Sequence, residues 1–327
     1  MSVLIFAELD QAADGTGSLR KSSLEAIFYG AQVAGMLGTT ATALVIGSAE
    51  APELELTGNY GATKVLHATA ERLAQPNNMA YATVLAAAAG QEGSSVVIIA
   101  KSSLGDAVAA RAAGKLKAGL VSNVVDLPEG DAASLRVKRS IYTGKAFAIT
   151  EMKSPVKIIT IRKNAVAPQT TDAKAAIEAF SPTLNDQDFV AQVTGVEKAT
   201  GEVPLTEADI IVSGGRGMRG PENWGILEDL AHALHAATGC SKPVSDLDWR
   251  PHHEHIGQTG IKVSPNLYVA CGISGAIQHL AGVNGSKVIV VINKDAEAPF
   301  FKAADYGIVG DVFDILPRLT KAVQSAG

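Results

Sequence analysis

The sequence predicts an α/β protein of two domains: a parallel sheet with added strands, followed by a doubly wound sheet. The chain has 327 residues, more than the ~100–200 of one typical domain. Short apolar runs alternate with amphipathic segments in both halves, as in sheets covered by helices. Between them lies the polar stretch TGVEKATGEVPLTEA, residues 194–208. We therefore expect domains over residues 1–200 and 201–327.

In the first half, strand-like and helix-like segments follow one another in turn. The expected strands cover residues 3–9, 42–47 and 95–101, and the expected helices cover residues 22–37, 77–91 and 104–116. After Leu120 the apolar runs GLVSNVVDL, LRVKRSIY, KAFAIT and KIITIR are separated only by loops. We expect these runs to be added strands that pair with each other. This half has no clustered histidines and no glycine-rich phosphate loop, which favours a scaffold or docking role.

The second half restarts the alternation. Strands are expected over residues 208–215, 266–272, 287–293 and 306–310, and helices over residues 221–239, 274–282 and 311–326. This pattern predicts a compact doubly wound domain. In such a domain, ligand-binding groups lie at the carboxyl ends of the strands. That is where the unusual residues of this half occur.

Composition excludes several classes of protein. Apolar residues make up 47% of the chain, and 28 Lys and Arg face 33 Asp and Glu, a net charge of −5. Because no stretch concentrates basic residues, we expect no nucleic-acid partner. No apolar run approaches the ~18 residues of a membrane span, and the start MSVLIFAELD lacks signal-peptide features, so we expect a cytoplasmic protein without membrane insertion. Cys240 and Cys271 cannot form a disulfide framework, and we expect buried thiols.

A literal G-x-G-x-x-G occurs at Gly215, Gly217 and Gly220, between an expected strand and an expected helix. Such a loop can bring backbone N–H groups to a phosphate. The acidic residue that grips a ribose ~20 residues later is not evident, since Asp246 and Asp248 lie 26 and 28 residues beyond Gly220. A nicotinamide site and a purely structural turn both stay open at this point.

Other features of the second half suggest contacts with a ligand. In YVACGISGAIQHLAG, Ser274 is expected to cap a helix that carries His279. The histidines of HHEHIGQTG do not have metal-ligand spacing, so we expect no metal there. The GQTG that follows is expected to bring backbone close to a flat ligand. Asn293 ends a strand where nucleotides commonly lie, and Asp311 is either a ligand contact or a helix N-cap.

Taken together, residues 208–327 resemble the alpha subunit of electron-transfer flavoproteins. The resemblance rests on VSGGRGM, GQTG, LYVACGISGAIQHLAG, INKDAEAPF and ADYGIVGD, which occur in the family's order and at its intervals. The opening VLIFAE and the organisation of the first half extend it over the whole chain. It implies FAD in the C-terminal domain, a separate beta subunit, electrons from dehydrogenases such as acyl-CoA dehydrogenases, and delivery to a quinone oxidoreductase.

The resemblance also assigns the residues around FAD. Arg216, Ser241 and Lys242 would contact it, Thr259 would bring its hydroxyl near N5, and His279 would address the pyrimidine edge. Asn293 and Asp311 would hold the adenosine end. The full set is Arg216, Ser241, Lys242, Ile256, Gly257, Gln258, Thr259, Ser274, Gly275, Ala276, Ile277, Gln278, His279, Asn293 and Asp311.

One position departs from the family pattern, because Lys242 stands where many members carry Arg. Lysine keeps a positive charge beside a half-reduced ring but lacks the planar fork that stacks and donates twice. A hydroxyl, a cation and an imidazole at Thr259, Lys242 and His279 suit the tuning of a flavin. No general base or nucleophile is required, so we expect an electron carrier with no catalytic residues.

Three alternatives are kept. A nicotinamide-dependent dehydrogenase would use the loop at residues 215–220. An adenine-nucleotide-binding module would place its ligand in the N-terminal half. An electron-bifurcating member of the same family would have a second FAD in its partner; the absence of iron–sulfur cysteines in this sequence favours the simple carrier.

Overall fold

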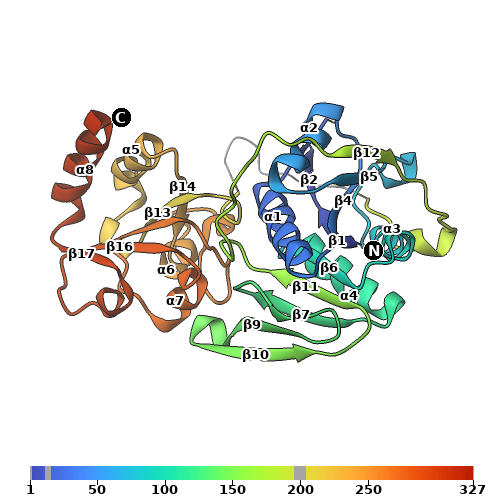
Figure 1. Cartoon of the computed structure of the whole chain (residues 1–327). Coiled ribbons are helices and arrows are strands. Elements are labelled where there is room, and N and C mark those ends of the chain that lie inside the picture. Colours follow the sequence, from blue (N-terminus) through green and yellow to red (C-terminus); the bar gives the residue numbers. More distant parts are fainter. Residues whose placement is uncertain (1, 12–15, 195–203, 327) are drawn as a thin grey trace. The chain divides into compact units, whose positions relative to one another are not determined.

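The computed structural model describes residues 2–11, 16–194 and 204–326 (Figure 1). It confirms the α/β class and both parallel sheets. Strands β1 to β12 belong to one compact unit and strands β13 to β17 to another. The expected boundary near residue 200 lies outside the described residues, so its position stays a prediction.

The first unit contains a ten-stranded sheet in the order β10-β9-β7-β11-β6-β1-β4-β5-β12, with β8 paired to β9. Its strands are β1 (Ser2–Ala7), β4 (Thr40–Ile46), β5 (Lys64–Ala68), β6 (Val96–Ala100), β7 (Gly119–Val124), β8 (Glu129–Gly130), β9 (Leu135–Ile141), β10 (Ala146–Met152), β11 (Lys157–Ile161) and β12 (Ala176–Ala179). The helices are α1 (Lys21–Met36), α2 (Ala51–Glu55), α3 (Asn78–Glu92) and α4 (Ser103–Leu116), and β2 (Leu9–Gln11) pairs with β3 (Gly17–Leu19). The pairs among β12, β5, β4, β1, β6, β11 and β7 are all parallel.

Strand β1 shows how the sequence buries both faces of this sheet. Val3 and Ile5 belong to the core that includes α1 residues, whereas Leu4 and Phe6 belong to the core that includes α3 and α4 residues. Successive side chains of a strand point to opposite faces, so an unbroken apolar run fits a strand covered on both sides.

The added strands pair with each other as expected, since β10, β9, β7 and β11 are successive neighbours in the sheet. β9 and β10 pair in antiparallel register. β11 lies between β7 and β6 and is parallel to both, so it also joins the added strands to the rest of the sheet. Its run of five buried residues needs neighbours on both edges and cover on both faces.

The second unit contains a five-stranded parallel sheet in the order β14-β13-β15-β16-β17. The strands are β13 (Ile210–Gly214), β14 (Ala237–Cys240), β15 (Leu267–Cys271), β16 (Val288–Asn293) and β17 (Tyr306–Val309), and the helices are α5 (Gly225–Ala233), α6 (Lys242–Asp246), α7 (Ile277–Val283) and α8 (Val312–Ala326). This is the doubly wound order 2-1-3-4-5, whose switch point lies between its first and third strands. β14 and α6 were not predicted; the former was included in the expected helix of residues 221–239.

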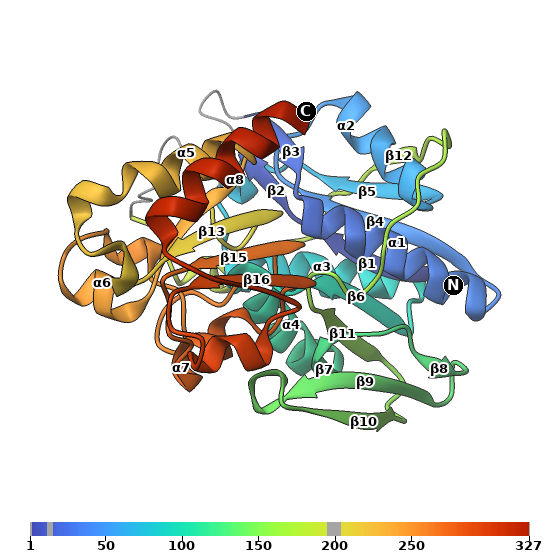
Figure 2. The same ribbon diagram turned by 90° about the vertical axis from the view of Figure 1, so that its left-hand side faces the viewer.

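Helices cover both faces of this smaller sheet. Leu227 of α5 and Leu316 of α8 share one buried core with Val269, whereas Val283 of α7 shares the other with Tyr268. Figure 2 shows α5 and α8 together over one face of β13, β15 and β16, with α7 on the opposite side. The two apolar layers hold the strands in place. The loops at the carboxyl ends of the strands lie outside these layers, so their sequences can vary.

Candidate functional site

The carboxyl ends of the five parallel strands lie at one edge of the C-terminal sheet. The strands end at Gly214, Cys240, Cys271, Asn293 and Val309. Apart from Ile256–Thr259, the predicted residues follow these ends or, for Asn293, form one: Arg216 follows β13, Ser241 and Lys242 follow β14, the 274–279 segment follows β15, and Asp311 follows β17. The structure therefore brings them to one edge.

The loops after β13 and β15 meet backbone to backbone at the switch point. The Gly215 N–H donates to the Cys271 carbonyl at 2.9 Å, and the Gly217 N–H donates to the Gly272 carbonyl at 3.0 Å. A Cβ on Gly217 would lie 2.6 Å from the Gly272 Cα, and Gly272 itself has φ +62°. These glycines are therefore required by packing between two loops.

This geometry differs from a nicotinamide fingerprint. After Gly220 the chain makes a 3-10 turn over Pro221–Asn223, and α5 begins only at Gly225. In the fingerprint the third glycine lets the helix pack closely on the strand, and the pyrophosphate lies on the N-terminus of that helix. Here it is Gly214 that lies against α5, since its Cβ would be 2.8 Å from Leu227 Cδ1.

The 256–260 segment is held from two sides. The Ile256 N–H donates to the Cys240 carbonyl at 3.0 Å, and the Gln258 N–H donates to the Gln278 carbonyl at 2.7 Å. A Cβ on Gly260 would lie 2.3 Å from the carbonyl oxygen of His255. Ile256 is buried, whereas Gln258 and Thr259 are exposed. The segment thus presents an amide and a hydroxyl at the sheet edge from a firmly bonded backbone.

The exposed groups at this edge are mostly polar. Exposed side chains belong to Arg216, Lys242, Gln258, Thr259, Ser274 and Gln278. The Lys242 ammonium lies 3.5 Å from Asp246 Oδ1, a solvent-exposed i,i+4 pair that holds it weakly. Ile277 adds an apolar side chain that is 58% exposed. Two cations, several hydrogen-bonding groups and one apolar contact suit an anionic ligand with a flat apolar part.

Three expected residues have internal contacts. Ser274 does not cap α7, because Ala276 occupies the N-cap position and the helix has no side-chain cap, while the Ser274 carbonyl accepts from Phe300 N–H at 3.1 Å. That expectation was wrong. Asn293 donates to the Ile273 carbonyl at 3.1 Å. Asp311 accepts from the Phe313 N–H at 3.1 Å, as a helix N-cap does.

Asp311 also has a partner that was not placed in the site from sequence. Arg219 forms an ion pair with Asp311, and its guanidinium carbon lies 4.6 Å from the centre of the Phe313 ring. Arg219 has φ +66° and stands in the glycine loop after β13. Only the pairing of β13, β15, β16 and β17 brings residues 219 and 311 together, and a local sequence pattern does not contain that information.

His279 lies in the interior. The residue is 6% exposed, and its Nε2 atom is 2.8 Å from the Tyr268 hydroxyl. Burial lowers the pKa of His279 to about 4, and the Ile256 carbonyl partly opposes that shift. The imidazole is therefore neutral at physiological pH. Its predicted contact with a flavin ring stays a prediction.

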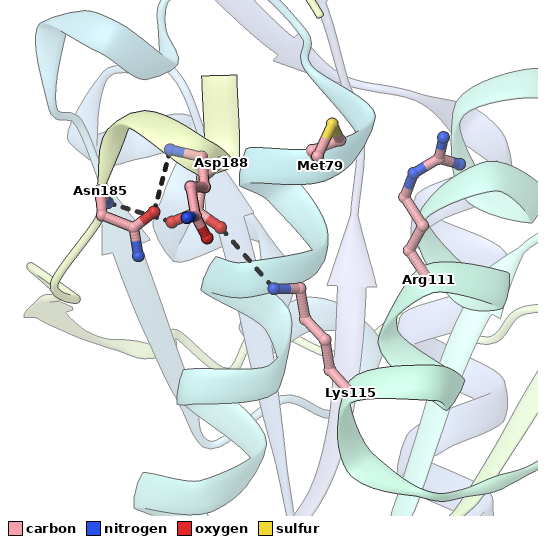
Figure 3. A pocket seen from close by; sticks show the side chains of 6 residues that line it. Met79, Arg111, Lys115, Asn185 and Asp188 are labelled. Carbon is pink, nitrogen blue, oxygen red and sulfur yellow. Dashed lines mark hydrogen bonds and ion pairs between the residues drawn. The ribbon is translucent and has the colours of Figure 1, made fainter. Parts of the chain in front are cut away.

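A cavity of about 330 Å³ is present in the N-terminal domain, lined by Met79, Arg111, Lys115, Asn185, Gln187 and Asp188. Lys115 Nζ lies 3.6 Å from Asp188 Oδ1, and the Asn185 N–H donates to Asp188 Oδ2 at 3.0 Å (Figure 3). The Thr83 hydroxyl donates to Asp188 as well. The carboxylate is thus already satisfied by protein groups, and nothing here favours an adenine-nucleotide site.

The matches to known proteins fall on both domains of the chain. Residues 9–185 match the electron transfer flavoprotein domain, and residues 204–284 match the electron transfer flavoprotein FAD-binding domain. The chain belongs to the electron transfer flavoprotein alpha subunit family. The resemblance found in the sequence is thereby confirmed, and the nicotinamide and adenine-nucleotide alternatives are not supported.

Curated relatives match along nearly the whole chain. The Bacillus subtilis electron transfer flavoprotein subunit alpha is 40% identical over 307 residues, which is 93% of each chain. The Pseudomonas aeruginosa subunit alpha is 39% identical over 330 residues, 99% of this chain and all of the relative. A probable mitochondrial subunit alpha of Caenorhabditis elegans is 34% identical over 324 residues.

FAD is the cofactor, since residues 204–284 match an FAD-binding domain. The geometry of the site also fits FAD. The His279 and His255 Nδ1 atoms are buried, and neither has a hydrogen-bond partner of good geometry among the described residues. Both rings lie beside the 256–260 segment. Asn293 and Asp311 lie beyond the last residue matched to the FAD-binding domain.

Two features are absent from the residues that the structure describes. None of the helices there has the length and apolar character needed to cross a bilayer. Within the same ranges, no cluster of three or more His, Cys, Asp or Glu side chains is arranged to hold a metal ion.

Proposed function

We propose that this chain is the FAD-carrying subunit of a heterodimeric electron carrier, completed by an electron transfer flavoprotein beta subunit. The supporting observation is that six exposed polar side chains from three carboxyl-end segments and the 256–260 segment converge at one edge of the FAD-binding domain. No nucleophile paired with a base accompanies them among the predicted site residues. Such a set suits binding and tuning of a cofactor more than chemistry on a substrate.

Each group has a proposed task. Arg216 and Lys242 supply positive charge for an anionic cofactor, and the buried Ser241 lies beside Lys242 at the end of β14. Gln258 and Thr259 offer hydrogen bonds from the rigid 256–260 segment. When bound, FAD supplies the electron storage, and the protein groups hold it and adjust its potential. Asn293 and Asp311 would hold its adenosine end while keeping their internal bonds.

The proposal extends to the route of the electrons. By family resemblance the donors are acyl-CoA dehydrogenases and related flavoprotein dehydrogenases, as in fatty acid beta-oxidation, and the acceptor is a quinone oxidoreductase. A cytoplasmic location accords with two free, buried cysteines. A second FAD in the beta subunit would make the complex an electron-bifurcating member. The number of FAD molecules per complex distinguishes that case from the simple carrier.

The experiment is co-purification of this chain with its beta subunit, followed by an absorption spectrum and a flavin count. We expect one FAD per alpha chain. Thr259→Val should weaken FAD binding about fivefold, the loss of roughly one hydrogen bond. Thr206→Val is the matched control, because Thr206 is also exposed but precedes the amino end of β13. A colourless complex, or equal losses in both variants, would refute the proposal.

A further inference from the structure

Two buried polar side chains, Tyr268 and His279, form a pair beneath the 256–260 segment. Their Oη and Nε2 atoms are 2.8 Å apart, and the two residues are 0% and 6% exposed. Tyr268 comes from β15 and His279 from the first turn of α7. Phe300 encloses the pair, with ring centres 6.4 Å from Tyr268 and 5.7 Å from His279. The packing leaves neither ring free to turn.

The hydrogen bond links the proton of Tyr268 to the tautomer of His279. Burial raises the pKa of Tyr268 and lowers that of His279 to about 4, so both are neutral near pH 7. A tyrosine hydroxyl that donates to Nε2 leaves the imidazole proton on Nδ1. Nδ1, the other ring nitrogen, is buried and has no hydrogen-bond partner among the described residues. The contact with the Tyr268 hydroxyl is therefore the side-chain hydrogen bond that decides the tautomer of the ring.

The imidazole lies where it can act on the 256–259 segment. Gln258 N–H donates to the carbonyl of Gln278, the residue before His279. A Cβ on Gly257 would lie 3.8 Å from the His279 Cα. The position of His279 thus bears directly on Ile256 to Thr259, which we propose to contact the flavin.

We propose that Tyr268 is a positioning residue. It fixes the tautomer and orientation of His279, and through His279 it fixes the position of the 256–259 segment that contacts FAD. The inference depends on the proposed flavin site. It adds a residue buried within the β-sheet that itself has no exposed surface for the cofactor. The effect of Tyr268 reaches FAD through its hydrogen bond to His279 and through helix α7, which carries His279.

The first test reads the tautomer directly. In Tyr268→Phe, the ¹⁵N shifts of the His279 ring should lose the pattern of a proton confined to Nδ1, both without and with FAD. Tyr81→Phe is the matched control, since Tyr81 is 3% exposed and its hydroxyl donates to the Leu73 carbonyl in the other domain. Unchanged His279 shifts in Tyr268→Phe would overturn the proposal.

The second test uses FAD affinity and does not depend on Tyr268→Phe folding. In His279→Asn the amide nitrogen can take the place of Nδ1, whereas in His279→Gln it can take the place of Nε2. We expect Asn to weaken FAD binding at least about fivefold more than Gln, because Asn loses the atom that contacts Tyr268. Equal affinities, or tighter binding by Asn, would overturn the inference. Absence of FAD from the unmodified complex would instead refute the proposed function.

Discussion

The packing of two glycine loops at the switch point makes a sharp prediction for Gly272→Ala. Gly272 has φ +62°, and its Cβ would lie 2.7 Å from the Cα of Gly217. The left-handed backbone costs an L-residue about 1–2 kcal/mol, and overpacking against backbone that cannot move aside costs about 1–3 kcal/mol. The substitution should therefore destabilise the C-terminal domain by about 2–5 kcal/mol. That is a large part of a typical domain's stability of ~5–15 kcal/mol.

The assay is urea unfolding followed by tryptophan fluorescence. The only two tryptophans, Trp224 and Trp249, both lie in the C-terminal domain, so their signal reports on that domain even if the other unfolds separately. With a urea slope of about 1–3 kcal/mol per M, the midpoint should fall by about 1 M or more. The slope itself should not change, because the folded sheet is the same.

Gly225→Ala is the control. Gly225 begins α5, and nothing lies within 4 Å of its Cβ position. Alanine there should leave the midpoint unchanged or slightly raised, because alanine favours helix. If Gly272→Ala unfolds at the same urea concentration as the parent protein, the contact between the loops after β13 and β15 is not the reason for these glycines.

Three further outcomes follow from the site. Burial raises the pKa of Cys240 and Cys271 to about 12, so both thiols should be inert to Ellman's reagent in the folded chain and react in urea; reaction of the folded chain would contradict this. Lys242→Arg keeps the charge but adds a planar fork, and should change the separation of the flavin's two one-electron potentials. Identical redox titrations of the variant and the parent protein would show that Lys242 does not contact the flavin. His279 has a folded pKa of about 4 against about 6.5 unfolded, so its contribution of roughly 3 kcal/mol is present above pH 6.5 and lost as pH falls to 4. Urea midpoints across this range should fall less in His279→Asn than in the parent protein, and equal falls would contradict the buried neutral imidazole.

Long, unbroken patterns in the sequence were sufficient for the fold class, and short ones were not. β1, β6 and β16 are continuous apolar runs, and each appears where it was expected. β14 was missed because Ala237–Cys240 contains a glycine and only one β-branched residue, and it directly follows a helical pattern. It becomes a strand because β13 offers it a parallel edge. That pairing is a tertiary effect with little local trace in the sequence.

The candidate site, like the fold, could be predicted only in part from the sequence. That its residues follow strands could be read from the sequence, because a parallel sheet places all strand ends of one kind at one edge. The internal contacts of single side chains could not. Ser274 resembled a helix cap, but Gly275 at φ +84° packs on Phe300 and moves the start of the helix to Ile277. The pairing of Arg219 with Asp311 and that of Tyr268 with His279 likewise depend on strand order.

The glycine loop shows why a motif's spacing cannot by itself identify its ligand. A glycine is needed wherever a Cβ would collide, and the sequence does not say with what. At Gly215 the colliding atom is the Gly272 carbonyl oxygen, 2.3 Å away, which belongs to the neighbouring loop. The same sheet order that brings ligand groups to a switch point also brings the first and third loops into contact there. Glycines are therefore expected in both loops of such a sheet whatever it binds, and the identity of the ligand must be argued from the exposed polar side chains around them.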